Sequence, residues 1–424
     1  MGIQSSMYSG ISGLATNGNA MSVIGNNIAN TNTVGFKASR SVFSDLLSSS
    51  VSGSGGISQV GRGVGLASID NIFSQGTFES TESSTDLAIE GSGFFMLRVP
   101  NDQEIFYSRA GAFNFDQDGN LINPEGYTVQ GYYLDANGNT VGDITDIAVE
   151  TQGYTPATAT TNIILSTNLN SKSPYLGGFD ITDPAGTANY ATSIRVYDSF
   201  GDTHLMTNYF VKMDPATNPL EWEVHTVVAS SDLKTPGPDA LTEIGSGALV
   251  FGVDGVLTAP VNLTTTAGAL DWFNEADPST QVTFDMQTTQ YASDSVVNSQ
   301  TQNGYAAGTL VKLDIDAAGI IYGKYSNGEP RALARLALSS FNNPGGLNKE
   351  GSNMFRATSL SGPPIVGTVG SGVGKLFTNS LEQSNVDLAQ EFVRMITIQR
   401  GFQANSKIIT TTDEMMNDLI NLKR

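Results

Sequence analysis

The first 28 residues place apolar side chains at the spacing of an amphipathic helix. The intervals between these positions are 4, 4, 3, 7, 3 and 4 residues, close to a heptad pattern. The apolar positions are Ile3, Met7, Ile11, Leu14, Met21, Ile24 and Ile28. Gly10, Gly13, Gly18 and Gly25 interrupt the stretch, and each weakens an isolated helix by up to about 1 kcal/mol relative to Ala. The pattern therefore predicts a helix that needs a partner to cover its apolar stripe.

A second helical pattern occupies the end of the sequence. Its apolar positions are separated by 4, 3, 7, 7, 7 and 4 residues. They cover about 35 residues, a length typical of coiled coils. These positions are Leu388, Phe392, Met395, Phe402, Ile409, Met416 and Ile420. Ser384 or Asn385 is predicted to cap the first turn, because both side chains accept hydrogen bonds from free backbone N–H groups. The two ends thus carry matching stripes, and we predict that the terminal helices pair.

The polar stretch NNIANTNTVGFK, residues 26–37, follows directly on the first stripe. Asparagine is a poor helix former, because its side chain competes for backbone hydrogen bonds. We predict that the stripe ends at Ile28 and that Asn30 stops the helix by adopting the left-handed conformation. Gly35 then permits a close backbone approach as the chain leaves in an extended path. The stretch is therefore predicted to be a junction rather than a disrupted helix.

The sequence changes character between the two ends. Residues 41–68 are rich in Ser and Gly and predict a linker or an irregular extended arm. From Ile69 onward, short apolar or alternating runs are separated by Asp-Gly and Asn-Gly signals, which indicate β-hairpins. A second β region covers about residues 150–290, and from Gly308 the first pattern returns. The order favours a nested arrangement, in which each inner domain is inserted into the next outer one.

The predicted fold class is multidomain α+β. Paired terminal α-helices form a coiled-coil-like inner layer, and two or more mainly antiparallel β domains are nested between them. The predicted boundaries assign 1–40 and 380–424 to a terminal helical polymerisation domain, 41–75 and 360–379 to an extended connecting region, 76–150 and 295–359 to an inner β domain, and 151–294 to an outer β insertion.

Charge is distributed unevenly along the 424 residues. The net charge is −20, whereas residues 1–50 sum to +1 and residues 381–424 sum to −1, so the whole excess lies between the ends. This balance argues against a nucleic-acid partner, which requires a basic surface. Neutral ends with an acidic middle indicate ends that pack against protein and a middle that faces water. The alternative is that the uneven acidity has no functional meaning.

Sequence patterns for catalysis or metal binding are weak. The absence of cysteine excludes disulfides, thiolate metal sites and cysteine nucleophiles. The two histidines, His204 and His225, have no metal-ligand spacing. The loops that begin at Asp116 and Asp135 lack the glycine that a calcium-binding loop needs and predict hairpin turns. A pair of catalytic carboxylates stays open, but no pair stands out. We therefore predict no enzymatic activity, no cofactor and no metal.

The N-terminus does not resemble a secretory signal. Its first charged residue is Lys37, and no unbroken apolar run precedes it. No apolar run is long enough to span a membrane, so we expect no membrane insertion. The protein is expected either to be cytosolic or to leave the cell by a route that reads no cleaved signal.

Four stretches resemble the axial proteins of the bacterial flagellum, a family of rod, hook and hook-associated proteins. NNIANTNTVGFK resembles the signature of this family, and residues 91–132 resemble the β module of its hook and distal-rod members. Residues 379–422, with E-x-SNVDL and Q-R-x-F-Q-A-N-S-K, resemble the C-terminal helix of the family, and residues 325–355 resemble the segment before it. These stretches lie at both ends of the chain and in the inner β regions, and their combination of motifs is specific.

The resemblance implies a structural subunit of the flagellar hook. Distal-rod members are shorter and lack a block comparable to residues 151–294, which favours the hook within this family. The implied assembly is a curved helical tube that acts as a universal joint, transmits torque from the rod to the filament and encloses the export channel. Its implied location is extracellular, between basal body and filament, after type III export without a cleaved signal peptide. Some family members form an inter-subunit crosslink through a cysteine, which this chain lacks.

The implied partners are other copies of the chain, the distal rod protein, the hook cap, the hook–filament junction proteins and the type III export apparatus. The implied assembly interface comprises both apolar stripes and the polar residues of the two signatures. Those polar and flanking residues are Asn26, Asn27, Asn30, Thr31, Thr33, Gly35, Phe36, Ser384, Asn385, Val386 and Asn405. In a tube, the asparagine amides are expected to lie between subunits and to fix their register, because unpaired buried amides are costly.

Three alternatives remain at this stage. The first is a distal-rod or other hook-associated member of the same family. The second is a secreted β-rich adhesin or enzyme, which would require a signal peptide and leaves the terminal heptads unexplained. The third is a cytosolic coiled-coil scaffold, which leaves the β modules unexplained.

Overall fold

The computed structural model describes residues 2–47, 49–53, 56–100, 102–135, 137–150 and 153–421. The chain forms two compact units. The first contains Met1–Thr151, Lys312–Gly323 and Arg331–Arg424, and the second contains Gln152–Val311 and Lys324–Pro330. The second unit is therefore inserted into the first, in agreement with the nested order. The finer four-part division drawn from the sequence stays a prediction.

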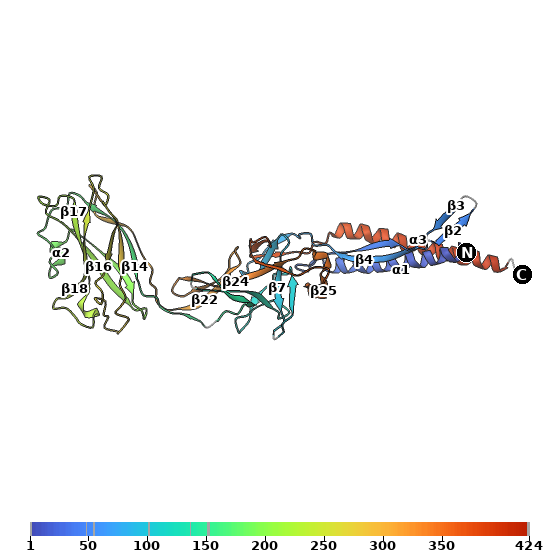
Figure 1. Ribbon diagram of the computed structural model, residues 1–424, viewed down its shortest axis with the longest axis horizontal. Helices are drawn as coiled ribbons and strands as arrows, with labels where there is room; N and C mark the ends of the chain where they lie inside the picture. The colour runs from blue at the N-terminus through green and yellow to red at the C-terminus, as the bar shows by residue number, and fades with distance from the viewer. Residues whose placement is uncertain are drawn as a thin grey trace. The chain divides into compact units, whose positions relative to one another are not determined.

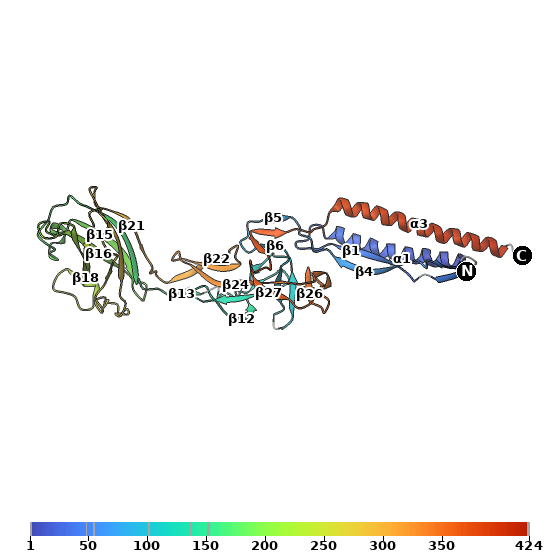
Figure 2. The same ribbon diagram turned by 45° about the horizontal axis from the view of Figure 1, so that its top comes forward.

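Two long helices form one layer of the first unit (Figures 1 and 2). α1 spans Gly2–Ala29 and α3 spans Leu388–Asn421. The helices lie side by side and antiparallel, since Gly10 faces Ile409 near one end of the layer while Gly401 faces Asn17 further along. The predicted pairing of the terminal helices is confirmed. Among the described residues, no helix is both long and apolar enough to cross a membrane.

Regular strands follow α1. β1 (Ser39–Asp45) pairs with β4 (Val64–Asn71), and β2 (Ser49–Gly53) pairs with β3 (Gly56–Val60), both antiparallel. β1 and β4 also pack against α1. The structure thus differs from the expected linker or irregular arm. The cause is that Val, Phe, Leu and Ile residues spaced among the serines favour strand pairing, although the Ser and Gly content of the segment conceals them.

A β domain makes up the rest of the first unit. Its elements are β5 (Phe78–Ser80), β6 (Leu87–Glu90), β7 (Phe94–Arg98), β8 (Ile105–Ser108), β9 (Asn114–Phe115), β10 (Leu121–Ile122), β11 (Thr128–Leu134), β12 (Thr140–Asp146), η2 (Pro344–Gly346), β25 (Asn348–Gly351), β26 (Met354–Arg356), β27 (Ile365–Thr368), β28 (Lys375–Thr378) and β29 (Ser380–Glu382). Edge-to-face aromatic contacts among Phe94, Tyr107, Phe341 and Phe355 form one of its cores. β28 pairs with β6 and β29 with β5, which ties the C-terminal segment to the start of the domain.

The second unit is built from two four-stranded sheets around a large core. Its elements are β13 (Tyr154–Thr155), β14 (Asn162–Asn170), α2 (Pro184–Thr187), β15 (Tyr190–Tyr197), β16 (Thr203–Lys212), β17 (Glu221–Ala229), η1 (Ser230–Asp232), β18 (Leu241–Val250), β19 (Val261–Thr264), β20 (Thr283–Tyr291) and β21 (Val296–Gln302). One sheet has the order β15-β16-β17-β18 and is antiparallel; the other has the order β19-β20-β14-β21, in which β14 and β20 are parallel. β22 (Gly308–Ile315), β23 (Ile320–Tyr325) and β24 (Pro330–Ser340) contain residues of both units.

Candidate assembly interface

The contact between α1 and α3 is made by small residues. A Cβ atom on Gly10 would stand 3.0 Å from Cγ1 of Ile409, and one on Gly13 would stand 2.7 Å from the side-chain amide of Asn405. Further along the contact, a Cβ atom on Gly401 of α3 would stand 3.3 Å from the side-chain amide of Asn17 of α1. The glycines that weaken α1 as an isolated helix therefore let the two backbones approach closely.

The predicted stripe of α1 is only partly covered by the chain itself. Ile24 is buried, and Leu14, Met21 and Ile28 are half-buried. Met7 and Ile11 are exposed, and the side chain of Ile3 lies outside the described residues. The side of α1 that packs on α3 instead includes Gly10, Gly13 and Asn17. Bulky apolar positions in the sequence do not identify this side of α1, because the two helices pack closely where α1 has residues without large side chains.

α3 keeps an apolar surface exposed. Of the predicted stripe, Met395, Ile409 and Met416 are half-buried. The exposed members are Leu388, Phe392, Phe402 and Ile420, joined by Val393, Ile396, Ile408 and Met415, which the heptad did not include. We call these eight residues the α3 apolar surface. Large exposed apolar patches mark interaction sites on soluble proteins.

Asn27 makes its contacts within the chain. Its side chain is completely buried, its Nδ2 donates to the carbonyl of Ser39 over 2.8 Å, and its Oδ1 accepts from the N–H of Ser39 over 3.0 Å. This pair fixes the end of α1 to the start of β1. We expected the amides of the signature to contact a neighbouring subunit. The amide of Asn27 instead makes its hydrogen bonds to Ser39 of the same chain.

The end of α1 forms differently from the prediction. Asn30 does not adopt the left-handed conformation; its Nδ2 donates to the carbonyl of Asn26 over 2.9 Å. Thr31 donates to the carbonyl of Ile28 and Thr33 to Oδ1 of Asn30. The left-handed residue is Gly35, at φ +71°, where a Cβ would overlap the backbone of the β module. Side-chain hydrogen bonds thus replace the predicted backbone reversal.

The start of α3 also differs from the prediction. The cap is Asp387, whose Oδ1 accepts from the N–H groups of Ala389 and Gln390 over 2.9 and 3.2 Å. Asn385 is instead a bridge: its Oδ1 accepts from the N–H of Ala38, and its Nδ2 donates to the carbonyl of Ile72. Ser384 accepts from the N–H of Val386 within its own turn. Asn385 thereby joins the C-terminal signature to the N-terminal one.

A buried ion cluster lies at the same junction. Lys37 Nζ is 2.6 Å from Glu382 Oε1, and Arg109 Nη1 is 3.6 Å from Glu382 Oε2. All three side chains are almost fully buried. Burial lowers the pKa of Lys37 and of Arg109 below their ordinary values, while the negative charge of Glu382 opposes both shifts. The cluster links the end of the N-terminal signature, the segment before α3 and the β module.

Lys37, Arg109 and Glu382 are not among the predicted interface residues. Two of them lie inside the quoted motifs, but a lone Lys and a lone Glu that lie 345 positions apart give no signal of pairing. Phe36 is buried beside them, with Nζ of Lys349 5.0 Å from its ring centre. Asn26 is exposed, and Asn405 lies half-buried between the helices. The N-terminal and C-terminal signatures therefore contact each other within one chain.

Four family profiles match successive parts of the chain. The flagella basal body rod protein profile matches residues 7–37, and the flagellar hook protein FlgE/F/G D1 domain matches residues 88–166. The flagellar basal body protein FlaE D2 domain matches residues 165–305, and the flagellar basal body rod FlgEFG protein C-terminal profile matches residues 378–422. The two terminal profiles coincide with the two helices that pack together.

Curated relatives match over nearly the whole chain. The flagellar hook protein FlgE of Borreliella burgdorferi is 37% identical over 99% of both chains, and that of Salmonella typhimurium is 37% identical over 99% of both chains. The crystal structure of Helicobacter pylori flagellar hook protein FlgE2 superposes with a TM-score of 0.51 at 18% identity, covering 72% of this chain and 100% of that one, which supports the fold. The chain therefore belongs to the flagellar hook protein FlgE family, and it is a structural subunit of the bacterial flagellar hook.

Proposed function

We propose that the chain polymerises through α1 and α3 into a curved helical tube that encloses the export channel. The tube acts as a universal joint and transmits torque from the rod to the filament. The observation that carries this proposal is the α3 apolar surface, which the chain leaves exposed although α1 packs along the same helix. Apolar surface of this kind gains a partner when copies associate, because its removal from water is favourable.

The proposal extends to location and partners. The subunit works outside the cell after type III export without a cleaved signal peptide. It meets the distal rod protein at its base, the hook cap during growth and the hook–filament junction proteins at its tip. The acidic character of the chain, with a net charge of −20, supports solvated outer domains that resist stray association.

The test is assembly of purified full-length chain followed by electron microscopy. We expect curved tubes from the native sequence and none from Phe392→Asp, because a charge placed in the α3 apolar surface must be desolvated on assembly. Val253→Asp is the matched control, since Val253 is 99% exposed and belongs to the second unit. Circular dichroism checks that both variants stay folded. Tubes of normal length from Phe392→Asp would contradict the proposal.

A further inference from the structure

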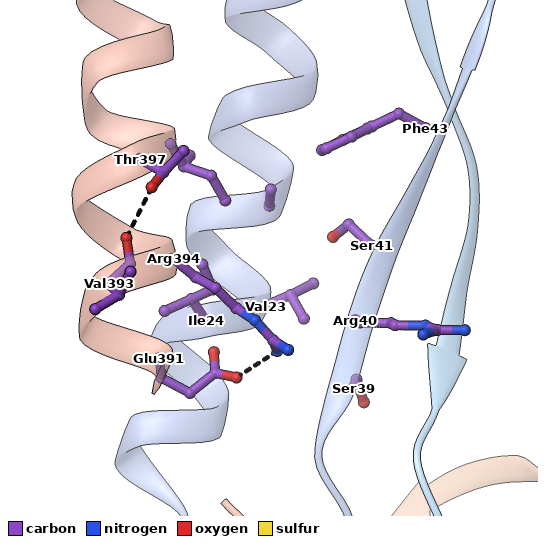
Figure 3. A pocket seen from close by; sticks show the side chains of 12 residues that line it. Val23, Ile24, Ser39, Arg40, Ser41, Phe43, Glu391, Val393, Arg394 and Thr397 are labelled. Atoms are coloured by element: carbon purple, nitrogen blue, oxygen red, sulfur yellow. Dashed lines mark hydrogen bonds and ion pairs between the residues drawn. The ribbon is translucent and has the colours of Figure 1, made fainter. Parts of the chain in front are cut away.

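An apolar groove lies between α1, α3 and β1 (Figure 3). It has a volume of about 360 Å³, and Val23 and Ile24 of α1, Phe43 of β1 and Ile398 of α3 contribute apolar side chains to it. Thr397 lines the same groove, and its hydroxyl is used within α3, where it donates to the carbonyl of Val393. The groove is therefore an apolar cleft with room for a large side chain.

Two buried polar atoms in the lining of this groove have no hydrogen-bond partner among the described residues, Oγ of Ser41 and one carboxylate oxygen of Glu391. Glu391 is buried, and its Oε1 accepts from Arg394 Nη1 over 2.8 Å. Its Oε2 has no hydrogen-bond partner among the described residues. The other cation of the lining, Arg40, is 3.7 Å from Asp70 at the surface. The occupant that complements this groove is thus apolar, carries a hydrogen-bond donor and brings no negative charge, because a buried acceptor without a donor is costly.

Tyr8 fits this description. Among the exposed large apolar side chains described on α1, α3 and β1, it alone carries a hydroxyl group, and it is 70% exposed. It lies in the second turn of α1, whose first turn has no acidic residue, so the positive end of the helix dipole is not offset there. The exposed Met415 and Ile420 are poorer candidates, because Asp413, Glu414 and Asp418 beside them would approach Glu391.

We infer that Tyr8 of a second copy of the chain occupies this groove, with its ring against Val23, Ile24 and Ile398 and its hydroxyl donating to Glu391. Tyr8 and the groove lie at different heights of one helical layer. The 15 residues from Tyr8 to Val23, which lines the groove, correspond to a rise of about 22 Å along α1. A contact between different surfaces of identical chains builds an open filament when the rotation between successive copies does not close into a ring. The inference rests on the proposed polymerisation and names one contact within it.

The absence of cysteine from the sequence makes crosslinking a direct test. We expect the double variant Tyr8→Cys with Thr397→Cys, assembled and then mildly oxidised, to give a ladder of covalent multimers on non-reducing gels. The control pairs Tyr8→Cys with Gln399→Cys, because Gln399 is exposed but lies about 200° further around α3. The control is expected to give no ladder above the single-cysteine background.

Single substitutions measure the strength of the contact. We expect Tyr8→Ala to raise the critical concentration for assembly by about 30-fold and Tyr8→Phe by about 10-fold, as for a buried aromatic anchor and one charge-assisted hydrogen bond. Tyr154→Ala, which removes an exposed tyrosine from the second unit, is expected to change it less than about 2-fold.

The outcomes separate this inference from the proposed function. Tubes that form without the 8–397 ladder, or with a ladder equal to that of the control, would overturn the inference and leave polymerisation intact. A single crosslinked dimer without higher multimers would overturn the head-to-tail arrangement. Failure of the unmodified chain to form tubes would overturn the proposed function itself.

Discussion

The second unit and the helical layer of the first unit bury different kinds of side chain. The core of the second unit contains Trp222, Phe210 and Phe284, each fully buried. In the helical layer, Gly10 and Gly13 of α1 and Gly401 of α3 lie at the contact between the helices, whereas Phe392 and Ile420 of α3 are exposed. Large buried side chains supply most of the free energy of folding, and small ones supply little.

This difference indicates that the two regions are stabilised in different ways. The second unit has a large core of its own within one chain, although Phe200, Val253 and Phe273 are exposed on its surface. The helical layer is closely packed but leaves its large apolar groups outside, so its stability is expected to rise when copies associate. Four predictions test this comparison, from the largest expected effect on the free energy of unfolding to the smallest.

Trp222→Ala should destabilise the second unit most. Removal of a fully buried tryptophan leaves a cavity and lowers the free energy of unfolding by about 3–5 kcal/mol. Urea denaturation followed by circular dichroism measures the loss, and hydrogen exchange locates it. We expect protection of α1 and α3 to stay unchanged. Equal loss of protection in the helices would mean that the two regions fold as one cooperative unit.

Lys37→Met tests the junction between the helical layer and the β module. It leaves the buried Glu382 with Arg109, at 3.6 Å, and the N–H of Gly76, at 2.8 Å, so we expect a loss of about 3 kcal/mol, toward the lower end for a broken buried pair. Arg40→Met is the matched control, because the Arg40–Asp70 pair is exposed and contributes at most about 1 kcal/mol. The same urea titration compares the two. A smaller effect for Lys37→Met than for its control would refute the role of the cluster.

Gly13→Ala and Gly18→Ala should change the stability of the helical layer in opposite directions. A methyl group on Gly13 displaces the side-chain amide of Asn405, which donates to the carbonyl of Gly401, and this predicts a loss of about 1 kcal/mol. Gly18 has no atom within 4 Å of the added carbon, so helix propensity predicts a gain of up to about 1 kcal/mol. Hydrogen exchange of the α1 amides measures the change in stability of both variants. A gain for both variants would show that the close approach of the helices is not required.

The environment of Asp198 indicates that the free energy of unfolding of the second unit falls slightly at acid pH. Burial alone would raise its pKa, but hydrogen bonds from Asn274, His204 and the backbone more than offset this and hold the pKa below its ordinary value. A carboxyl group with a lowered pKa stabilises the fold above its unfolded pKa of about 3.9 and loses that contribution as the pH falls further. Between pH 5 and 2 we expect a loss of about 1 kcal/mol that Asp198→Asn lacks. An unchanged pH profile in Asp198→Asn would contradict this assignment.

The two helices and the β regions were predictable because their signals are local. Apolar periodicity over a long stretch identifies a helix whatever it packs against, and Asp-Gly and Asn-Gly turns identify hairpins. The pairing of β1 with β4 was not predictable, since Ser and Gly dominate the segment that contains both strands. The helix caps were placed within a few residues but on the wrong side chains, because Asn385 is occupied by the backbone near Ala38 and leaves capping to Asp387.

The sequence by itself determined that NNIANTNTVGFK is a junction and that two marginal helices lie at the ends of the chain. Only the tertiary structure decided what the junction joins. Asn27 holds Ser39, and Lys37 meets Glu382 from the other end of the chain. The physical reason is that periodicity and turn chemistry depend on neighbours in sequence, whereas the pairing of buried polar groups depends on which distant segments the fold brings together. For the same reason, the apolar stripe of α1 is visible in the sequence, whereas its glycine contact with α3 and the groove between α1, α3 and β1 are visible only in the structure.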